Sequence, residues 1–384
     1  MAVPKFKDME RAYGFDEVAL VPGNITINPD QTNIELTIGN FTFSIPILAA
    51  AMDAVVDPNF AILLHKLGGL AVLNLDGVQT RYEKPNEVLA EITQASANEV
   101  TSLLQKIYSQ PIKEKLIGER IQTIKQAGAT CAVSVIPATT KRLAPIAKEA
   151  GADILVVQST VTTARHISKS YRGLIFSELC QTVAPMPVIV GNCVTYSTSL
   201  ELMKTGIDGI LVGVGPGAAC TTREVLGVGV PQVTATMDCA AARETYHKET
   251  GKYVAVITDG GIRTGSDLCK AFASGADAVM LGSIMAQAEE APGKGYHWGM
   301  AHPHPSLPRG TRIKAGIRAP LERLLFGPTS VTDGTENFVG ALRTAMGVCG
   351  ALTIEDMHKV KMAIAPAIKT EGKYLQSIQG MCSG

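Results

Sequence analysis

The chain has no net charge, since 35 lysines and arginines balance 35 aspartates and glutamates over 384 residues. Without an excess of either sign, there is no electrostatic basis for binding nucleic acid, an anionic membrane or a polyanionic substrate. No run of about 18 apolar residues occurs, and the N-terminal sequence MAVPKFKDME is charged where a signal peptide would be apolar. We therefore expect a cytoplasmic protein that binds neither nucleic acid nor membranes.

Metal-binding and disulfide patterns are also lacking. The 8 cysteines form no C-x-x-C pair, and no histidine spacing typical of a zinc site accompanies them. Most of these cysteines are expected to be small buried apolar residues. Cys220 differs, because it lies in the glycine-rich stretch GVGPGAACTTREV, residues 213–225. Such a loop suits contact with a phosphate, a flat ring or a cation, so Cys220 is either a nucleophile or a packing residue.

Short apolar segments of strand length recur along the chain, and amphipathic helical patterns separate them. Being apolar on both faces, they are expected to be buried parallel strands. They cover residues 45–53, 69–75, 131–137, 153–160, 187–192, 209–215, 253–261 and 278–285. Eight such units predict a closed (β/α)8 TIM barrel. The alternative, a doubly wound sheet, would bring a G-x-G-x-x-G turn, which is absent.

Residues 1–384 are predicted to form a single barrel domain with two departures from the repeat. Residues 76–128 are a charged helical insert after the second strand, and residues 294–316 are a polar, proline-rich loop after the eighth. Loops that follow barrel strands lie at the C-terminal mouth, where active sites form. We expect the second stretch to be a mobile active-site flap, with a disordered surface insertion as the alternative.

The seventh and eighth strands end in motifs that suit a nucleotide, and barrel enzymes often bind phosphate in the loops after these strands. The seventh ends in Asp259-Gly260-Gly261 and the eighth in Gly282-Ser283. Bare glycine amides and the serine hydroxyl suit phosphate oxygens, and the Asp259 carboxylate suits two ribose hydroxyls. These features predict a site for a nucleoside monophosphate.

Cys220 follows the sixth strand and is therefore expected at the same mouth. There its thiolate is suited to attack a ring carbon, with Thr222, two residues on, placed to pass a proton. An inert cysteine beside a phosphate loop is the alternative.

With these motifs in this order, the chain resembles the IMP dehydrogenase and GMP reductase superfamily. The matching stretches are FDEVALVPG (15–23), PILAAAMDAV (46–55), LGGLAVLN (67–74), VIVGNCVT (188–195), VGVGPGAACTTREV (212–225), GVPQVTA (229–235), ITDGGIRTGSDLCKA (257–271), VMLGSIMAQAEEAPG (279–293) and WGMA (298–301). The resemblance implies a (β/α)8 barrel, a homotetramer, a purine nucleoside monophosphate as substrate and a nicotinamide cofactor stacked on the purine.

The resemblance also implies roles for individual residues. Cys220 matches the nucleophile that attacks C2 of the purine, and Thr222 matches its proton-transfer partner. Substrate contacts are implied for Met52, Gly217, Ala218, Asp259, Gly261, Gly282, Ser283, His297, Gly299, Met300 and Ala301. Cofactor contacts are implied for Ser159, Thr160 and Asn192. The backbone carbonyls of Gly215, Gly217 and Cys220 match potassium ligands found in many dehydrogenases.

Departures from the family pattern bear on which reaction is catalysed. Residues 76–128 are too few for the regulatory nucleotide-sensing modules typical of dehydrogenases, so the chain resembles a short dehydrogenase-like branch without allosteric purine sensing. The loop GPGAACTTR resembles reductases, but Ala315 stands where reductases need a glutamate. Without that carboxylate, departing ammonia loses general acid help worth on the order of 10² to 10⁴ in rate.

We therefore predict an IMP dehydrogenase that converts IMP to XMP with NAD in guanine nucleotide synthesis, through a thioimidate on Cys220 hydrolysed by a flap-activated water. The activating group is Arg309 by resemblance, with Arg312, His302 and His304 as alternatives. GMP reductase, which converts GMP to IMP with NADPH and releases ammonia, and a non-catalytic purine-nucleotide-binding homologue are the rival functions. The choice between NAD and NADP stays open, because Gln158 replaces a dehydrogenase aspartate.

Overall fold

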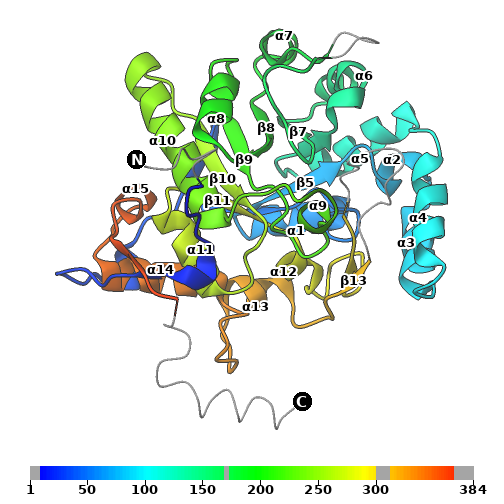
Figure 1. Ribbon diagram of the computed structural model, residues 1–384. Helices are drawn as coiled ribbons and strands as arrows, with labels where there is room; N and C mark the ends of the chain where they lie inside the picture. The colour runs from blue at the N-terminus through cyan, green and yellow to red at the C-terminus, as the bar shows by residue number, and fades with distance from the viewer. Residues whose placement is uncertain (1–8, 168–172, 300–311, 367–384) are drawn as a thin grey trace, which may run out of the picture.

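Eight parallel strands close into a barrel in the computed structural model, which describes residues 9–167, 173–299 and 312–366 (Figure 1). The order around the barrel is β10-β11-β4-β5-β6-β7-β8-β9. The strands are β4 (Ile47–Ala49), β5 (Leu70–Asn74), β6 (Ala132–Val135), β7 (Ile154–Gln158), β8 (Val188–Cys193), β9 (Gly209–Val212), β10 (Ala255–Asp259) and β11 (Ala278–Leu281). Each falls on one of the predicted apolar segments, so the (β/α)8 TIM barrel is confirmed.

Both faces of these strands are buried, which explains why the segments are apolar throughout. One set of side chains fills the barrel interior and includes Leu48, Val72, Ile154, Ile189, Leu211, Ile257 and Met280. The alternate set packs outward against the helices and includes Ile47, Leu73, Val133, Leu155, Val190 and Val256. Hairpin β2 (Leu36–Ile38) and β3 (Phe41–Phe43) adds Leu36, Ile38 and Phe43 to the interior cluster.

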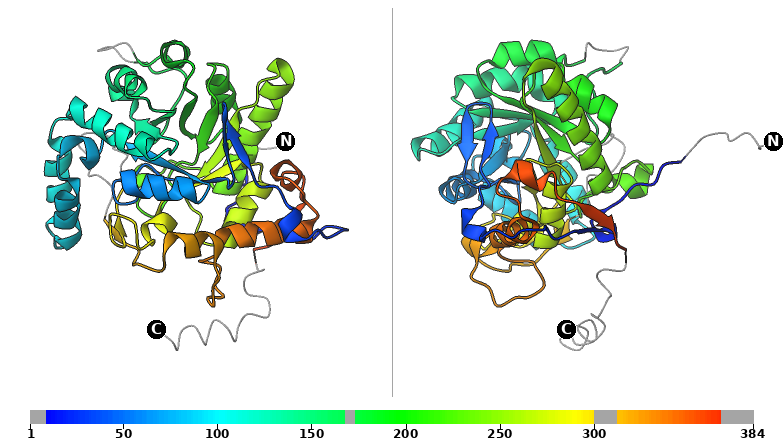
Figure 2. Two further views of the ribbon diagram at one scale, coloured as in Figure 1. Left: turned by 180° about the vertical axis from the view of Figure 1, so that it is seen from behind. Right: turned by 90° about the vertical axis from the view of Figure 1, so that its left-hand side faces the viewer.

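Helices surround the strands, as Figure 2 shows. The main ones are α1 (Pro58–Lys66), α5 (Glu114–Gln126), α6 (Pro137–Glu149), α7 (Phe176–Val183), α8 (Tyr196–Met203), α10 (Gln232–Thr250), α11 (Gly265–Ala273) and α14 (Phe338–Cys349). Shorter elements are η1 (Phe15–Glu17), β1 (Val18–Leu20), η2 (Pro29–Gln31), α13 (Leu321–Phe326), α15 (Ile354–Met357) and β14 (Met362–Ile364). Within the described residues, every helix is too short or too polar to cross a lipid bilayer.

Residues 76–128 contain α2 (Val78–Arg81), α3 (Pro85–Gln94) and α4 (Val100–Ser109) ahead of α5. Helix α5 packs against α1 and α6 as part of the outer ring, whereas α3 and α4 pack on each other and on α2. Figure 1 shows α3 and α4 at the opposite end of the molecule from α14 and α15. The single-domain organisation and the bounds of the insert and the flap stay predictions, since residues 300–311 lie outside the described residues.

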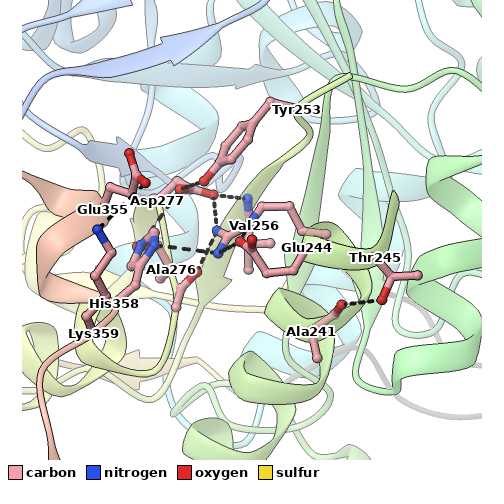
Figure 3. Close-up of polar contacts among 12 residues, drawn as sticks. Ala241, Glu244, Thr245, Tyr253, Val256, Ala276, Asp277, Glu355, His358 and Lys359 are labelled. Atoms are coloured by element: carbon pink, nitrogen blue, oxygen red, sulfur yellow. Dashed lines mark hydrogen bonds and ion pairs between the residues drawn. The ribbon is translucent and has the colours of Figure 1, made fainter. Parts of the chain in front are cut away.

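A buried ion pair ties α10 to the N-terminal end of β11. Arg243 Nη1 donates to Asp277 Oδ2 at 2.8 Å, and the two side chains are 2% and 11% exposed. The carboxylate also accepts from the amide of Val256 at 2.7 Å and from the hydroxyl of Tyr253 at 2.6 Å. Figure 3 shows Asp277 with His358 of the C-terminal segment, whose Nε2 lies 3.8 Å from Oδ1. Each carboxylate oxygen therefore has a partner, as a buried charge requires.

Removing the carboxylate from this network should destabilise the fold. We expect Asp277→Ala to lower the free energy of unfolding by about 3 to 5 kcal/mol, because Arg243 would stay buried without its counter-charge. Urea unfolding followed by circular dichroism measures the change. Glu244→Gln is the matched control, since Glu244 contacts Arg243 from the solvent side and is 66% exposed. It should cost less than about 1 kcal/mol, and a similar small loss for both variants would contradict the prediction.

Candidate active site

Cys220 lies between β9 and α9 (Thr222–Leu226), on the loop that leaves the C-terminal end of β9. Its amide donates to the carbonyl of Gly217 at 3.0 Å, and its Sγ lies 3.1 Å from Thr222 Oγ1. Cys220 is partly exposed, Thr222 is buried at 3% exposure, and Ala218 of the same loop is exposed. The structure therefore brings together the thiol and the hydroxyl that the sequence pairs in catalysis.

Other cysteines have a different environment. Burial raises the pKa of Cys131 and of Cys269 to about 12, so these thiols stay protonated at neutral pH. Both are buried within the main apolar core. This agrees with the expectation that most cysteines of this chain are packing residues.

The cysteine loop and the Asp259-Gly260-Gly261 turn pack backbone against backbone, which explains their glycines. A Cβ on Gly213 would lie 2.3 Å from the carbonyl oxygen of Asp259, and a Cβ on Gly261 would lie 3.1 Å from Pro216 Cβ. Gly260 and Gly261 have φ angles of 86° and 79°, which side chains other than glycine rarely tolerate. The two motifs, separated in sequence, thus form one surface beside the thiol.

Two of the predicted phosphate residues, Gly282 and Ser283, lie at the start of α12 (Ser283–Ala286), directly after β11. A Cβ on Gly282 would lie 2.9 Å from Met52 Sδ, so the bare glycine lets Met52 rest on this turn. Ser283 Oγ lies 3.0 Å from His297 Nε2 of β12 (Tyr296–His297). His297 is 1% exposed, and burial lowers the pKa of its imidazole, which favours the neutral ring. Within the described part of the chain, its Nδ1 has no hydrogen-bond partner.

Asp259 ends β10 and is held by two amide side chains. Its Oδ2 accepts from Asn192 Nδ2 at 2.8 Å and from Gln158 Nε2 at 2.9 Å, and Gln158 Nε2 also lies 3.0 Å from Asn192 Oδ1. Burial raises the pKa of Asp259 to about 6, although both amide donors act to lower it. Among the described residues, both donors bond Oδ2 and none bonds Oδ1.

Sequence reasoning treated Gln158 as a departure and missed its partnership with Asp259. The position of Gln158 in the sequence could have indicated this contact. Gln158 ends β7, Asn192 lies at the end of β8, and these strands are neighbours. Parallel neighbours place such residues side by side at the same rim of the barrel.

The implied cofactor residues Ser159, Thr160 and Asn192 lie beside Asp259, and Asn192 is one of its two hydrogen-bond donors. The Ser159 amide donates to the carbonyl of Gly191 at 2.9 Å, and the Asn192 amide donates to the carbonyl of Ser159 at 3.0 Å. Ser159 Oγ lies 2.8 Å from Thr162 Oγ1, and Thr160 is half-buried in the same loop. Hydroxyl and amide groups of this kind suit the ribose and carboxamide of a nicotinamide cofactor.

Part of the predicted site falls outside the described residues, namely Met300, Ala301, His302, His304 and Arg309. Their contacts stay predictions. Gly299 is half-buried immediately before this stretch.

Arg312 is described, and its guanidinium binds the end of α3. Its Nη1 lies 2.5 Å from the carbonyl of Ile92 and 3.2 Å from that of Thr93. The guanidinium carbon lies 4.8 Å from the centre of the Tyr296 ring, within cation–π range.

Residues 9–167, 173–299 and 312–366 contain no cluster of three or more histidine, cysteine, aspartate or glutamate side chains that could hold a metal ion. Potassium ligation by the carbonyls of Gly215, Gly217 and Cys220 is a separate matter and stays a prediction. One of these carbonyls, that of Gly217, accepts from the Cys220 amide.

Comparisons with known proteins agree with the fold and the motifs. The family described as IMP dehydrogenase / GMP reductase domain matches residues 12–301. An uncharacterized oxidoreductase of Mycobacterium tuberculosis is 38% identical over 92% of this chain and 96% of its own length. The inosine-5'-monophosphate dehydrogenase of Cryptosporidium parvum is 28% identical over 92% of each chain.

A solved structure shows the same similarity. The IMP dehydrogenase/GMP reductase-like protein of Corynebacterium glutamicum superposes with a TM-score of 0.88 at 35% identity, over 95% of this chain and 97% of that protein. The resemblance drawn from the motifs is thereby confirmed. The chain belongs to the IMP dehydrogenase / GMP reductase family of oxidoreductases.

Proposed function

We propose that this protein is an IMP dehydrogenase, which oxidises IMP to XMP with NAD in guanine nucleotide synthesis. The observation that carries the proposal is the approach of Cys220 Sγ to Thr222 Oγ1, at 3.1 Å, in a loop packed on the Asp259-Gly260-Gly261 turn. A nucleophile and a relay hydroxyl beside a ribose-binding carboxylate suit covalent chemistry on a purine nucleotide.

The substrate would be held from two sides. Asp259 offers Oδ1 to the ribose hydroxyls, since Asn192 and Gln158 already occupy Oδ2. The phosphate would bind at the turns that contain Gly261, Gly282 and Ser283. His297 would orient the Ser283 hydroxyl, since its Nε2 lies 3.0 Å from Ser283 Oγ. Met52, which rests on Gly282, would contact the purine. This arrangement would fix C2 of the base near Cys220.

In the covalent step, Cys220 Sγ bonds to C2 of the purine while Thr222 passes on the thiol proton. Ser159, Thr160 and Asn192 would hold NAD, which when bound would supply the chemistry of accepting the hydride from C2. Water then adds to C2, the carbon–sulfur bond breaks, XMP leaves and the thiol regains a proton. Arg309 is proposed to activate that water. A homotetramer and potassium at the Gly215, Gly217 and Cys220 carbonyls belong to the same proposal by family resemblance.

GMP reductase is the second candidate function, favoured by the loop sequence GPGAACTTR. It requires an acid to protonate the C2 amino group as it leaves as ammonia, and Ala315 supplies none. Two acidic residues that follow α12, Glu289 and Glu290, are the candidate acids, and Glu290 Oε2 already accepts from the amide of Leu321 at 2.9 Å. These observations support the dehydrogenase over the reductase.

The direct test is the change in reduced-nicotinamide absorbance with IMP plus NAD, IMP plus NADP, or GMP plus NADPH, in potassium buffer. We expect cofactor reduction with IMP and NAD, and a loss of at least about 10³-fold in Cys220→Ala, since the covalent intermediate cannot form without the thiol. Gln110, on the surface of the insert, provides a control as Gln110→Ala.

Other results would assign a different function. Oxidation of NADPH with release of ammonia from GMP would make the protein a reductase. Protection of Cys220 from thiol labelling by IMP, with no hydride transfer under any condition, would make it a nucleotide-binding homologue without turnover.

The pKa of Asp259 predicts how substrate affinity depends on pH. The carboxylate form accepts hydrogen bonds from the ribose, so the KM for IMP should rise as the pH falls through about 6, where Asp259 gains a proton. Gln158→Leu removes a donor that lowers this pKa, so the rise should begin at a higher pH. Initial rates between about pH 5 and 8 measure both curves. Asp259→Asn should bind weakly without this pH dependence; a wild-type KM that is constant across the range would refute the assignment.

A further inference from the structure

Helix α4 reaches the candidate active site through one buried side chain, Tyr108. Its hydroxyl donates to Asp53 Oδ2 at 2.6 Å and accepts from Trp298 Nε1 at 2.8 Å. Tyr108, Asp53 and Trp298 are 6%, 1% and 0% exposed. At these distances and this burial, the two bonds form a well-defined chain of three side chains from three separate segments.

Both partners of Tyr108 adjoin residues of the proposed nucleotide site. Asp53 follows Met52, which rests on Gly282 of the phosphate turn. Trp298 follows His297, which lies 3.0 Å from Ser283. The hydroxyl of Tyr108 therefore links Asp53, in the loop after β4, to Trp298, in the segment after β11. These two residues flank the Gly282-Ser283 turn through their neighbours Met52 and His297.

Asp53 is also fixed to the beginning of the insert. Its Oδ2 accepts from the amide of Val78, the first residue of α2, at 3.0 Å. A Cβ on Gly77 would lie 2.0 Å from Asp53 Oδ1, so this approach requires glycine at position 77. The carboxylate thus contacts both α2 and α4.

Trp298 is fixed by apolar packing as well as by its hydrogen bond. It belongs to the separate apolar cluster of Ala54, Val78, Leu89, Ile92, Val100, Leu104, Ile107 and Tyr108, most of which come from α2, α3 and α4. Strand β12 pairs with β13 (Ile313–Lys314), and Arg312, next to β13, binds the carbonyls at the end of α3. Both strands of this hairpin are therefore anchored on the insert.

We propose that Tyr108 is a positioning residue for the nucleotide, holding Met52 and His297 in place around Ser283, so that the helical insert is part of the substrate site. The inference rests on the proposed function, because it requires a purine nucleotide at this turn. In this proposal Tyr108 acts through its hydrogen bonds to Asp53 and Trp298 rather than on the reacting atoms.

The test is Tyr108→Phe, which keeps the ring in the apolar cluster and removes the hydrogen bonds to Asp53 and Trp298. We expect the KM for IMP to rise about tenfold while kcat changes less than about twofold, as for loss of ground-state positioning without loss of chemistry. A purely structural role would instead lower stability and leave the KM of the folded enzyme unchanged.

Binding is measured separately from turnover. Trp298 is the only tryptophan of the chain, so its fluorescence reports this site directly. Titration of wild type with IMP should change the emission, and the midpoint should shift about tenfold upward in Tyr108→Phe, in parallel with KM. Trp298→Phe removes the indole donor together with part of the buried ring, and it should raise the KM in the same direction, which covers the case in which Tyr108→Phe fails to fold.

Tyr82→Phe is the matched control. Tyr82 OH donates to the carbonyl of Ile107 at 3.1 Å within the same insert and makes no hydrogen bond to Asp53 or Trp298. Its IMP affinity should equal that of wild type. The positioning role of Tyr108 would be wrong if folded Tyr108→Phe kept the wild-type affinity for IMP, or if Tyr82→Phe lost as much affinity. Neither result would affect the proposed function. A wild-type protein that binds neither IMP nor GMP would overturn the proposed function, and the inference with it.

Discussion

Closure of eight parallel strands determines where the groups at the mouth of the barrel lie, because the carboxyl ends of all strands meet at one rim. Strands β9, β10 and β11 are consecutive around the barrel, and they deliver Cys220, Asp259 and Ser283 respectively. Strands β7 and β8 are likewise neighbours and deliver Gln158 and Asn192. Sequence separation is therefore no obstacle to assembling a site, and the rigid hydrogen-bonded strands set its spacing.

Backbone proximity is the second constraint. The turns after β9 and β10 approach so closely that a side chain on Gly213 or Gly261 would collide with the opposite loop. Glycine at these positions lets the two turns pack together beside the cysteine loop. At these turns the half-buried carboxylate of Asp259 is stabilised in its charged form by two amide donors and destabilised by burial, which brings its pKa to about 6.

Patterns local in sequence were sufficient to predict the barrel and much of the rim. Strands buried on both faces are apolar runs, and the loops that follow them carry recognisable glycine, cysteine and aspartate motifs. Contacts between segments far apart in the sequence are not accompanied by any motif or periodicity of this kind. No motif singles out Tyr108 within the helical insert, and Gln158 stands where dehydrogenases have an aspartate. Arg312 looked like a free flap cation, although backbone carbonyls of α3 hold it. These roles depend on which surfaces meet in three dimensions.

The insert shares its apolar cluster with Trp298, and this limits how the chain is able to change over evolution. An autonomous module inserted in a loop is exchangeable, because its interior contains only its own residues. Helices α3 and α4 instead bury a side chain that the host barrel supplies from beyond β11. The helices and Trp298 therefore depend on each other for burial: loss of the helices would expose the tryptophan, and a graft of either part alone would leave an apolar surface exposed to water.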